Sequence, residues 1–194
     1  MDCEQGKHTL RVAMRERRSA MTAEEHLAAS QAAQTRLAAS SLLSGVRTVG
    51  LYAALPSEVR TDALAGALSI AGRLVCYPVV RDDARALDFR RLSGSFHTGA
   101  LGVREPGGER VDLTEIDLFV VPAIAADLTG GRLGRGRGHY DATLAAAGPR
   151  ALRVVLLFDW QIVPAVPVDR HDQRVDAVCT EKRLVRCSRE EAPA

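Results

Sequence analysis

The chain has 194 residues and a formal net charge of +2, with 46% hydrophobic and 26% charged residues. This length suits one domain with a substantial core, so we expect a single domain over residues 1–194 with a frayed tail at 187–194. The small net charge argues against a dedicated binder of long nucleic acids. No apolar run approaches the roughly 18 residues of a membrane-spanning helix and no signal-peptide core is present, so we expect a cytoplasmic protein.

The cysteines indicate neither a redox motif nor a structural metal site. Cys3, Cys76, Cys179 and Cys187 form no CxxC pair, and no histidine stands at zinc-ligand spacing from them. We therefore expect four reduced thiols.

Two helices are predicted near the beginning of the chain. Between Lys7 and Arg18, the apolar Leu10 and Met14 share one helix face, and most of the arginines lie outside it. Thr22 and Glu25 form a capping box that predicts a second helix running to about residue 39.

The hydrophobic pattern then changes to strands that alternate with helices. Residues 48–53 and 74–80 are predicted to be buried strands. Thr61 is expected to cap a helix over 62–71 between them. This order calls for a parallel pair of strands with a right-handed crossover.

The rest of the chain continues the pattern. A more exposed strand is predicted at 86–92 and a loop at 93–110. Buried strands are predicted at 116–121 and 152–158, and a short last strand at 175–179. The predicted fold is a three-layer α/β/α sandwich, Rossmann-like, around a mainly parallel sheet of about five strands.

The most informative segment is 130–141, which reads GGRLGRGRGHYD. Glycines let backbone N–H groups converge on an anion at the start of a helix, and arginines add forked donors for phosphate oxygens. Asp141 precedes the apolar run 142–147, which is predicted to form that helix, so its carboxylate is suited to hold Mg²⁺ beside a phosphate. This chemistry is typical of a phosphate site.

The preceding strand favours a built site rather than a flexible surface loop rich in glycine and arginine. The apolar run 116–122 ends in Pro122, so the glycines follow the carboxyl end of a strand, where open α/β sheets bind ligands. The segment lacks the Gly-Lys-Ser/Thr ending of a P-loop and the acidic residue of a dinucleotide fingerprint.

Three other groups are candidates, and each has a plain structural alternative. Lys7 and Arg11 lie on one side of a predicted helix, where they either face a ligand or extend along the edge of the core. Glu58 follows a strand and either binds a ligand or is simply solvated. His171 and Asp172 form either a metal or acid–base pair or an ordinary surface dipeptide.

Together these segments resemble the 5-formyltetrahydrofolate cyclo-ligases, also called methenyltetrahydrofolate synthetases, from Lys7 to about Glu181. The most specific part is 132–141, which looks like the family's arginine-leucine-glycine motif with alternating glycines, an aromatic pair and a closing aspartate. Weaker matches arrive in the family's order at 7–11, 56–61, Gln161, 171–172, 175–176 and 180–181.

The resemblance implies roles for particular residues. Asp141 and Asp172 would help to hold Mg²⁺, Arg135 and Arg137 would meet the charge on the transferred phosphoryl group, and Glu58 would bind the pterin. The folate would also lie along Arg135, Gly136, Arg137, Gly138 and His139. The implied ATP site consists of Lys7, Arg11, Arg132, Leu133, Gly134, Arg135, Gly136, Arg137, Gly138, His139 and Tyr140.

The reaction implied by the resemblance is ATP-driven conversion of 5-formyltetrahydrofolate to 5,10-methenyltetrahydrofolate, with release of ADP and phosphate. ATP phosphorylates the formamide oxygen, N10 attacks the activated carbon and phosphate departs, so no enzyme nucleophile is required. We expect a monomer with neither nucleic-acid nor membrane partners. Tyr52, Leu55 and Trp160 are suggested as apolar walls for the folate rings, although core packing explains them equally well.

One position departs from the family pattern, because His139 stands where a second aromatic residue is usual. A histidine is planar and still stacks and hydrogen bonds. Two other hypotheses stay open: a non-catalytic or divergent folate- or nucleotide-binding relative with the same fold, and an RNA-binding module using Arg132, Arg135 and Arg137. Aromatic residues make up 4% of the chain, which is sparse for stacking on RNA bases.

Overall fold

The computed structural model describes residues 3–18, 20–99, 102 and 104–188. At its centre five parallel strands form the middle of an eight-stranded sheet. They are β1 (Thr48–Gly50), β2 (Leu74–Val79), β7 (Leu118–Val121), β10 (Leu152–Leu156) and β11 (Ala177–Cys179). β3 (Asp88–Arg91), β6 (Arg110–Val111) and β12 (Leu184–Arg186) extend it by antiparallel pairing, giving the order β12-β11-β10-β7-β1-β2-β3-β6.

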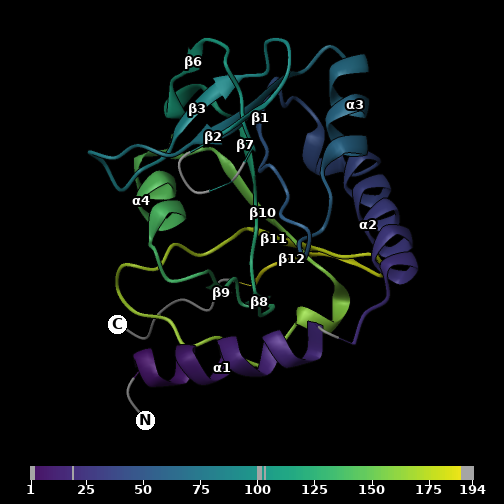
Figure 1. Cartoon of the computed structure of the whole chain (residues 1–194), viewed down its shortest axis with the longest axis vertical. Helices are drawn as coiled ribbons and strands as arrows, with labels where there is room; N and C mark the ends of the chain where they lie inside the picture. The colour runs from purple at the N-terminus through teal and green to yellow at the C-terminus, as the bar shows by residue number, and fades with distance from the viewer. Residues whose placement is uncertain (1–2, 19, 100–101, 103, 189–194) are drawn as a thin grey trace.

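The sequence therefore predicted the five parallel strands and also β3, which lies within the predicted strand 86–92, whereas β6 and β12 make the sheet larger than expected. Helices cover both faces: α2 (Ala23–Ala38) and α3 (Asp62–Ile70) lie on one side and α4 (His139–Ala146) on the other (Figure 1). In β7, Val120 belongs to the core cluster that contains Leu37 of α2, whereas Phe119 and Val121 belong to the cluster that contains Leu144 of α4. Because alternate side chains point to opposite faces, a strand covered on both faces is apolar throughout.

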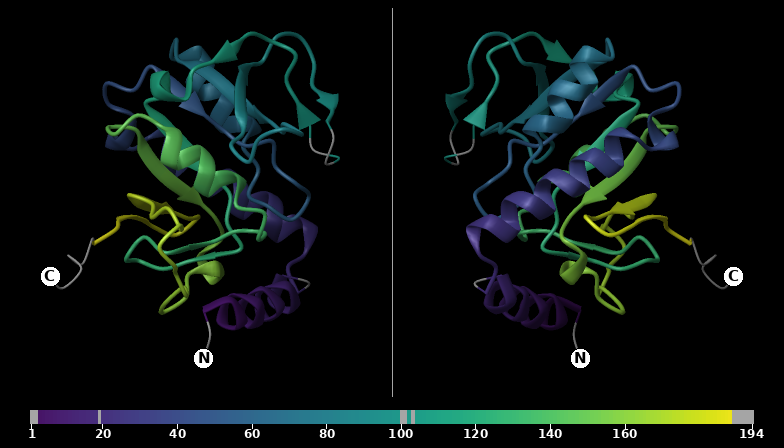
Figure 2. Two further views of the ribbon diagram at one scale, coloured as in Figure 1. Left: turned by 90° about the vertical axis from the view of Figure 1, so that its left-hand side faces the viewer. Right: turned by 90° about the vertical axis from the view of Figure 1, so that its right-hand side faces the viewer.

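The N-terminal helix α1 (Cys3–Arg18) lies below these layers in both views of Figure 2, and it contacts the short strand β8 (Ala125–Ala126). The capping box of Thr22 and Glu25 is present at the start of α2, as predicted. Among the described helices, none is long and apolar enough to cross a membrane.

The predicted cap of α3 is wrong in its chemistry. Thr61 occupies the N-cap position, but its buried hydroxyl donates to the carbonyl of Tyr52 at 2.8 Å. The Leu64 amide, which a capping side chain would satisfy, instead donates to Oε1 of Gln34 at 3.0 Å. A glutamine 30 positions away in α2 therefore performs the capping.

The predicted loop 93–110 contains a small hairpin of β4 (His97–Thr98) and β5 (Arg104–Glu105), and it ends in β6. Strands of two residues leave no readable alternation, so the pattern missed them. Of the predicted tail, the amides of Cys187 and Ser188 hydrogen bond to the carbonyls of Asp176 and Leu128, and 189–194 lie outside the described residues. Short 3-10 helices span Ser41–Leu43, Leu113–Glu115 and Asp159–Gln161.

We predict that Gly50→Ala destabilises the fold. A β-carbon on Gly50 in β1 would lie 2.8 Å from Phe89 and 3.2 Å from Phe119, so two packed rings would have to shift. Overpacking of this kind costs roughly 1–3 kcal/mol, which urea unfolding would measure. The matched change Gly66→Ala in α3, where a β-carbon meets nothing within 4 Å, should instead stabilise by about 0.5–1 kcal/mol. Equal effects of the two changes would contradict the steric explanation.

Candidate functional site

A cavity of about 830 Å³ lies at the carboxyl ends of the parallel strands. Residues just beyond β1, β2 and β7 line it, including Tyr52, Val80 and Pro122. Open α/β sheets bind ligands at this edge, and the volume is that of an ordinary ligand pocket.

The structure brings every residue that was predicted to bind ATP, folate or Mg²⁺ to this cavity, except one suggested apolar wall. Of the three suggested apolar walls, Tyr52 and Leu55 belong to the lining, but Trp160 does not. Trp160 stacks on Phe158 with ring centroids 6.4 Å apart and lies beneath the Arg17 guanidinium, so core packing explains it. Besides these walls, the candidates that line the cavity are Lys7, Arg11, Glu58, Arg132, Leu133, Gly134, Arg135, Gly136, Arg137, Gly138, His139, Tyr140, Asp141, His171 and Asp172.

The glycines of 130–141 divide into two groups, which corrects their interpretation as one phosphate-binding run. Gly130 and Gly131 form the turn between β8 and β9 (Arg132–Leu133), where the Gly131 amide donates to Oδ1 of Asp127 at 2.9 Å. Gly130 has a φ of 93°, and a β-carbon on Gly131 would collide with the Asp127 carboxylate. These two glycines are therefore required by the hairpin.

The other glycines form the cavity wall and the start of α4. Gly136 and Gly138 have positive φ angles of 91° and 69°, and Gly138 occupies the N-cap position without a side-chain cap. The Ala142 amide bonds to the Gly138 carbonyl, whereas the earlier amides at 139–141 precede the first helical hydrogen bond. Uncapped amides at a helix start that borders a cavity are suited to bind an anion.

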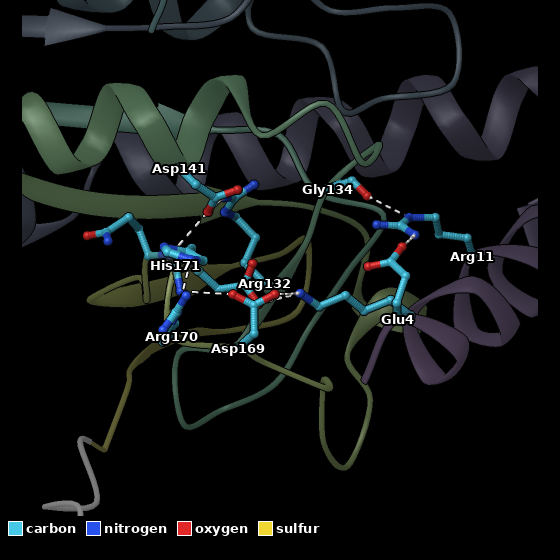
Figure 3. Close-up of polar contacts among 11 residues, drawn as sticks. Glu4, Arg11, Arg132, Gly134, Asp141, Asp169, Arg170 and His171 are labelled. Atoms are coloured by element: carbon cyan, nitrogen blue, oxygen red, sulfur yellow. Dashed lines mark hydrogen bonds and ion pairs between the residues drawn. The ribbon is translucent and has the colours of Figure 1, made fainter. Parts of the chain in front are cut away.

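Arg11 braces this loop from α1 (Figure 3). Its Nε donates to the Gly134 carbonyl at 3.1 Å, and its Nη1 donates to Glu4 at 3.1 Å. A β-carbon on Gly136 would lie 3.4 Å from the guanidinium, so the loop runs directly against it.

Arg132 and Asp141 form an ion pair across the two ends of the loop. The Arg132 side chain is 3% exposed, and its guanidinium donates to Oδ1 of Asp141 at 2.6 Å (Figure 3). The same oxygen accepts the Gln173 amide at 3.1 Å. A buried guanidinium does not face a long polynucleotide, which counts against the RNA-binding hypothesis.

The Lys7 side chain is 7% exposed, so it does not extend into solvent from the edge of the core. Its ammonium lies 2.8 Å from Asp169 and 2.6 Å from Asp172. Burial alone would lower the pKa of Lys7, but hydrogen bonds to the two carboxylates outweigh it and hold the pKa above its usual value. The Asp172 carboxylate faces Lys7, while His171 accepts from the Arg170 side chain at 3.0 Å, so His171 and Asp172 do not act as one pair.

Glu58 is held in place rather than freely solvated. It accepts the Leu55 amide at 3.0 Å and the Arg135 guanidinium at 3.3 Å, and its side chain is 13% exposed. Nearby, the Tyr140 hydroxyl is buried and has no hydrogen-bond partner among the described residues. Burial, followed by the Glu58 charge, raises the pKa of Tyr140, so its hydroxyl stays protonated and available as a donor.

His139 hydrogen bonds through Nδ1 to the carbonyl of Arg85 at 2.8 Å. A carbonyl only accepts, so Nδ1 carries the proton. The departure from the family pattern therefore adds a polar link between α4 and the segment after β2. Gln161 supports another part of the wall, because its buried side chain donates to the carbonyls of Ala123 and Ile124.

Sequence reasoning missed several lining residues, notably Arg18, Arg85 and Glu105. Arg18 donates to the Ser57 hydroxyl at 2.8 Å, beside Glu58. No short motif marks these residues, since each reaches the cavity from a separate element. The basic end of the first helix was the only available signal for Arg18.

The acidic residues present fit the donor set that Mg²⁺ uses beside phosphates. No group of three or more His, Cys, Asp or Glu residues suited to a metal occurs in the described part of the chain. Mg²⁺ commonly takes one or two carboxylates and completes its shell with phosphate oxygens and water. Asp141 and Asp172 both line the cavity, and the contacts to Arg132 and Lys7 each use one carboxylate oxygen.

Comparisons with known proteins show the family and the fold that the chain resembles. Residues 3–181 match the profile of the 5-formyltetrahydrofolate cyclo-ligase family. A 5-formyltetrahydrofolate cyclo-ligase from Mycolicibacterium smegmatis is 35% identical over 145 residues, covering 71% of this chain and 75% of that protein. One from Mus musculus is 28% identical over 189 residues, covering 90% and 93%. The structure of Aquifex aeolicus 5,10-methenyltetrahydrofolate synthetase matches with a TM-score of 0.81 and 27% identity over 97% of this chain and 95% of that chain.

We predict that Asp127→Asn destabilises the hairpin that leads into the loop, and does so in a pH-dependent way. Burial alone would raise the pKa of Asp127, but donors including the Val166 amide and the Thr129 hydroxyl hold the pKa below its usual value. Because the pKa of Asp127 is lower in the folded than in the unfolded state, its ionised carboxylate stabilises the fold at pH values above the unfolded pKa of about 3.9. This contribution is lost as the pH falls through the folded pKa.

At pH 7 the free energy of unfolding of Asp127→Asn should be roughly 1–3 kcal/mol lower than that of wild type. Below about pH 4 this difference in the free energy of unfolding should become smaller. Urea unfolding at a series of pH values measures both. The control is Asp82→Asn on an exposed loop, which should change little. A gap that stays constant down to pH 2 would refute the electrostatic account.

Proposed function

The chain belongs to the 5-formyltetrahydrofolate cyclo-ligase family, and we propose that it converts 5-formyltetrahydrofolate to 5,10-methenyltetrahydrofolate while ATP is cleaved to ADP and phosphate. The observation that carries the proposal is the content of the cavity. A glycine-arginine loop and an uncapped helix start border the same cavity as apolar side chains and Glu58. The cavity therefore offers backbone N–H groups and arginines to nucleotide phosphates, and adjacent apolar side chains to a flat folate ring.

In this proposal the phosphates of ATP lie against Gly134–Tyr140 and the first amides of α4. Lys7 and Arg132, with their charged groups buried beside the cavity, add fixed positive charge. Arg135 is 53% exposed at its side chain and Arg137 is exposed, so both have room to reorient toward the transferred phosphoryl group. Such donors match the charge that develops on that group.

The chemistry needs positioning more than enzyme nucleophiles. The formyl oxygen on N5 attacks the terminal phosphorus of ATP, and the bond from that phosphorus to ADP breaks. N10 then attacks the activated carbon, its proton is released and phosphate leaves, so the carbon bridges N5 and N10. The protein's contribution is to hold the formyl oxygen in line with the phosphate and to stabilise the charge.

The folate side of the cavity is proposed to lie along Tyr52, Leu55 and Val80. These side chains suit the faces of a bicyclic ring, and Glu58, held by the Leu55 amide, suits an N–H group elsewhere on its rim. The buried Tyr140 hydroxyl supports the assignment, because a donor without a protein partner is expected to meet a ligand.

Asp141 and Asp172 are the residues that would hold Mg²⁺. The ion would neutralise charge on the ATP phosphates. The cytoplasmic location and the monomeric state are predictions made from the sequence alone.

The first experiment is to mix purified protein with ATP, Mg²⁺ and 5-formyltetrahydrofolate and to follow the near-ultraviolet absorbance of the methenyl product. We expect product that depends on both ATP and folate. Reactions without ATP and without folate are the controls. Protein that is folded and binds ATP but forms no product would favour the non-catalytic or divergent relative.

Asp141→Asn tests the proposed metal role. Asparagine keeps an oxygen for Arg132, whereas alanine would leave a buried guanidinium unpaired at a cost of roughly 3–5 kcal/mol. We expect turnover to fall at least about tenfold, and the Mg²⁺ concentration needed for half-maximal ATP binding to rise, as measured by calorimetry.

The matched control for Asp141→Asn is Glu115→Gln, an exposed carboxylate away from the cavity. It should leave turnover and the Mg²⁺ requirement unchanged. If Asp141→Asn retains the wild-type Mg²⁺ requirement, Asp141 is not a metal ligand.

A further inference from the structure

Glu105 is a buried carboxylate on the cavity wall, and none of the roles proposed above involves it. It ends β5, lines the cavity and is 5% exposed. Its Oε1 accepts the Val80 amide at 3.0 Å. Among the described residues this is its one hydrogen bond from a protein donor, and no lysine or arginine there forms an ion pair with it.

Another carboxylate of this chain shows what burial normally requires. Asp127, 3% exposed, accepts hydrogen bonds from the amides of Thr129, Gly131 and Val166 and from the Thr129 hydroxyl. Burying a carboxylate is costly unless its oxygens are hydrogen bonded. Glu105 is about as deeply buried as Asp127, but most of the lone pairs on its carboxylate accept no hydrogen bond from a described residue. The carboxylate also borders the cavity.

The structure fixes where the Glu105 carboxylate lies. Its bond to Val80 places it beyond the carboxyl end of β2. A β-carbon on Gly99 would collide with the carboxylate, so Gly99 provides its space. The edge-to-face contact of Phe96 with Tyr77, at 4.9 Å between centroids, holds the β4–β5 hairpin against β2.

The two glutamates of the cavity differ in their partners. Glu58 already has a cation, since the Arg135 guanidinium lies 3.3 Å from it. Glu105 has the apolar Pro78, Val80 and Leu87 on the same wall. A carboxylate in such surroundings is suited to a neutral, flat ligand with N–H donors at its edge, because both carboxylate oxygens can accept two parallel donors.

We propose that Glu105 recognises the aminopyrimidinone edge of the pterin by accepting its 2-amino group and the adjacent ring N–H. This inference rests on the proposed function, and it names the residue that determines which way round the ring enters the cavity. With that edge held at Glu105, the orientation of the bicyclic ring is fixed, and so is the side on which the N5 formyl group lies.

The test compares Glu105→Gln with wild type by calorimetry in the absence of ATP. The ligands are 5-formyltetrahydrofolate and its 2-desamino-2-methyl analogue, which lacks the amino donor. We expect wild type to prefer the parent by roughly tenfold or more, because an unmatched buried polar group weakens binding strongly. Glu105→Gln, which presents a donor to a donor, should bind the parent at least about tenfold more weakly and lose the preference.

Controls separate recognition from structure. Glu109→Gln, an exposed glutamate in the same region, should behave as wild type, and ATP affinity should be unchanged in both variants. If Glu105→Gln weakens both folates equally, or neither, the proposal is wrong. Gly99→Ala, which displaces the carboxylate without removing it, is the second variant if Glu105→Gln lowers the melting temperature, and it should reduce the preference in the same way.

The two proposals fail in different ways. If wild type prefers the parent folate but forms no product, the reaction is wrong and the role of Glu105 stands. If wild type forms product but binds parent and analogue equally, only the role of Glu105 is wrong. If wild type binds neither folate, both are wrong.

Discussion

The ion pair between Arg132 and Asp141 holds the two ends of the glycine loop together, and the candidate site depends on it. Nη2 of Arg132 lies 2.6 Å from Oδ1 of Asp141, and the side chains are 3% and 25% exposed. Removing two charges from water costs several kcal/mol per ion and is offset only by good geometry and further hydrogen bonds. Here the Gln173 amide adds to the same carboxylate oxygen, so a third segment joins the pair. Because the ion pair joins β9 to α4, both ends of the glycine segment between them are fixed, and its backbone lines the cavity.

The same principle recurs around the cavity. Lys7 lies between Asp169 and Asp172, and Arg135 lies beside Glu58, so each of these cations has a carboxylate partner. Such pairing keeps positive charge at the proposed phosphate site while each cation is balanced by a carboxylate in the free protein. A phosphate that enters must compete with carboxylates that are already in place. Specificity then comes from matching the whole set of donors rather than from charge alone.

The sequence predicts most of what local patterns encode. Apolar runs such as that around Val120 mark the parallel strands, because strands covered on both faces are apolar throughout. The candidate residues of 132–141, which line the cavity, follow from glycine and arginine chemistry and from the resemblance. What could not be predicted depends on contacts distant in sequence. Gln34 caps α3 from another helix, and Glu105 reaches the cavity from a strand of two residues. Neither leaves a periodic signal.

The cluster of Lys7, Asp169 and Asp172 also bears on how the molecule is made. The N-terminus of a chain leaves the ribosome first, so α1 emerges long before the two carboxylates that pair with Lys7. The farther of them, Asp172, lies 165 positions after Lys7. The strands β1, β2 and β7 all precede these carboxylates in the sequence, so they are synthesised before the cluster can be completed. A chain that stops short of residue 172 would therefore contain most strands of the sheet but would lack Asp172 and Gln173 from the lining of the cavity.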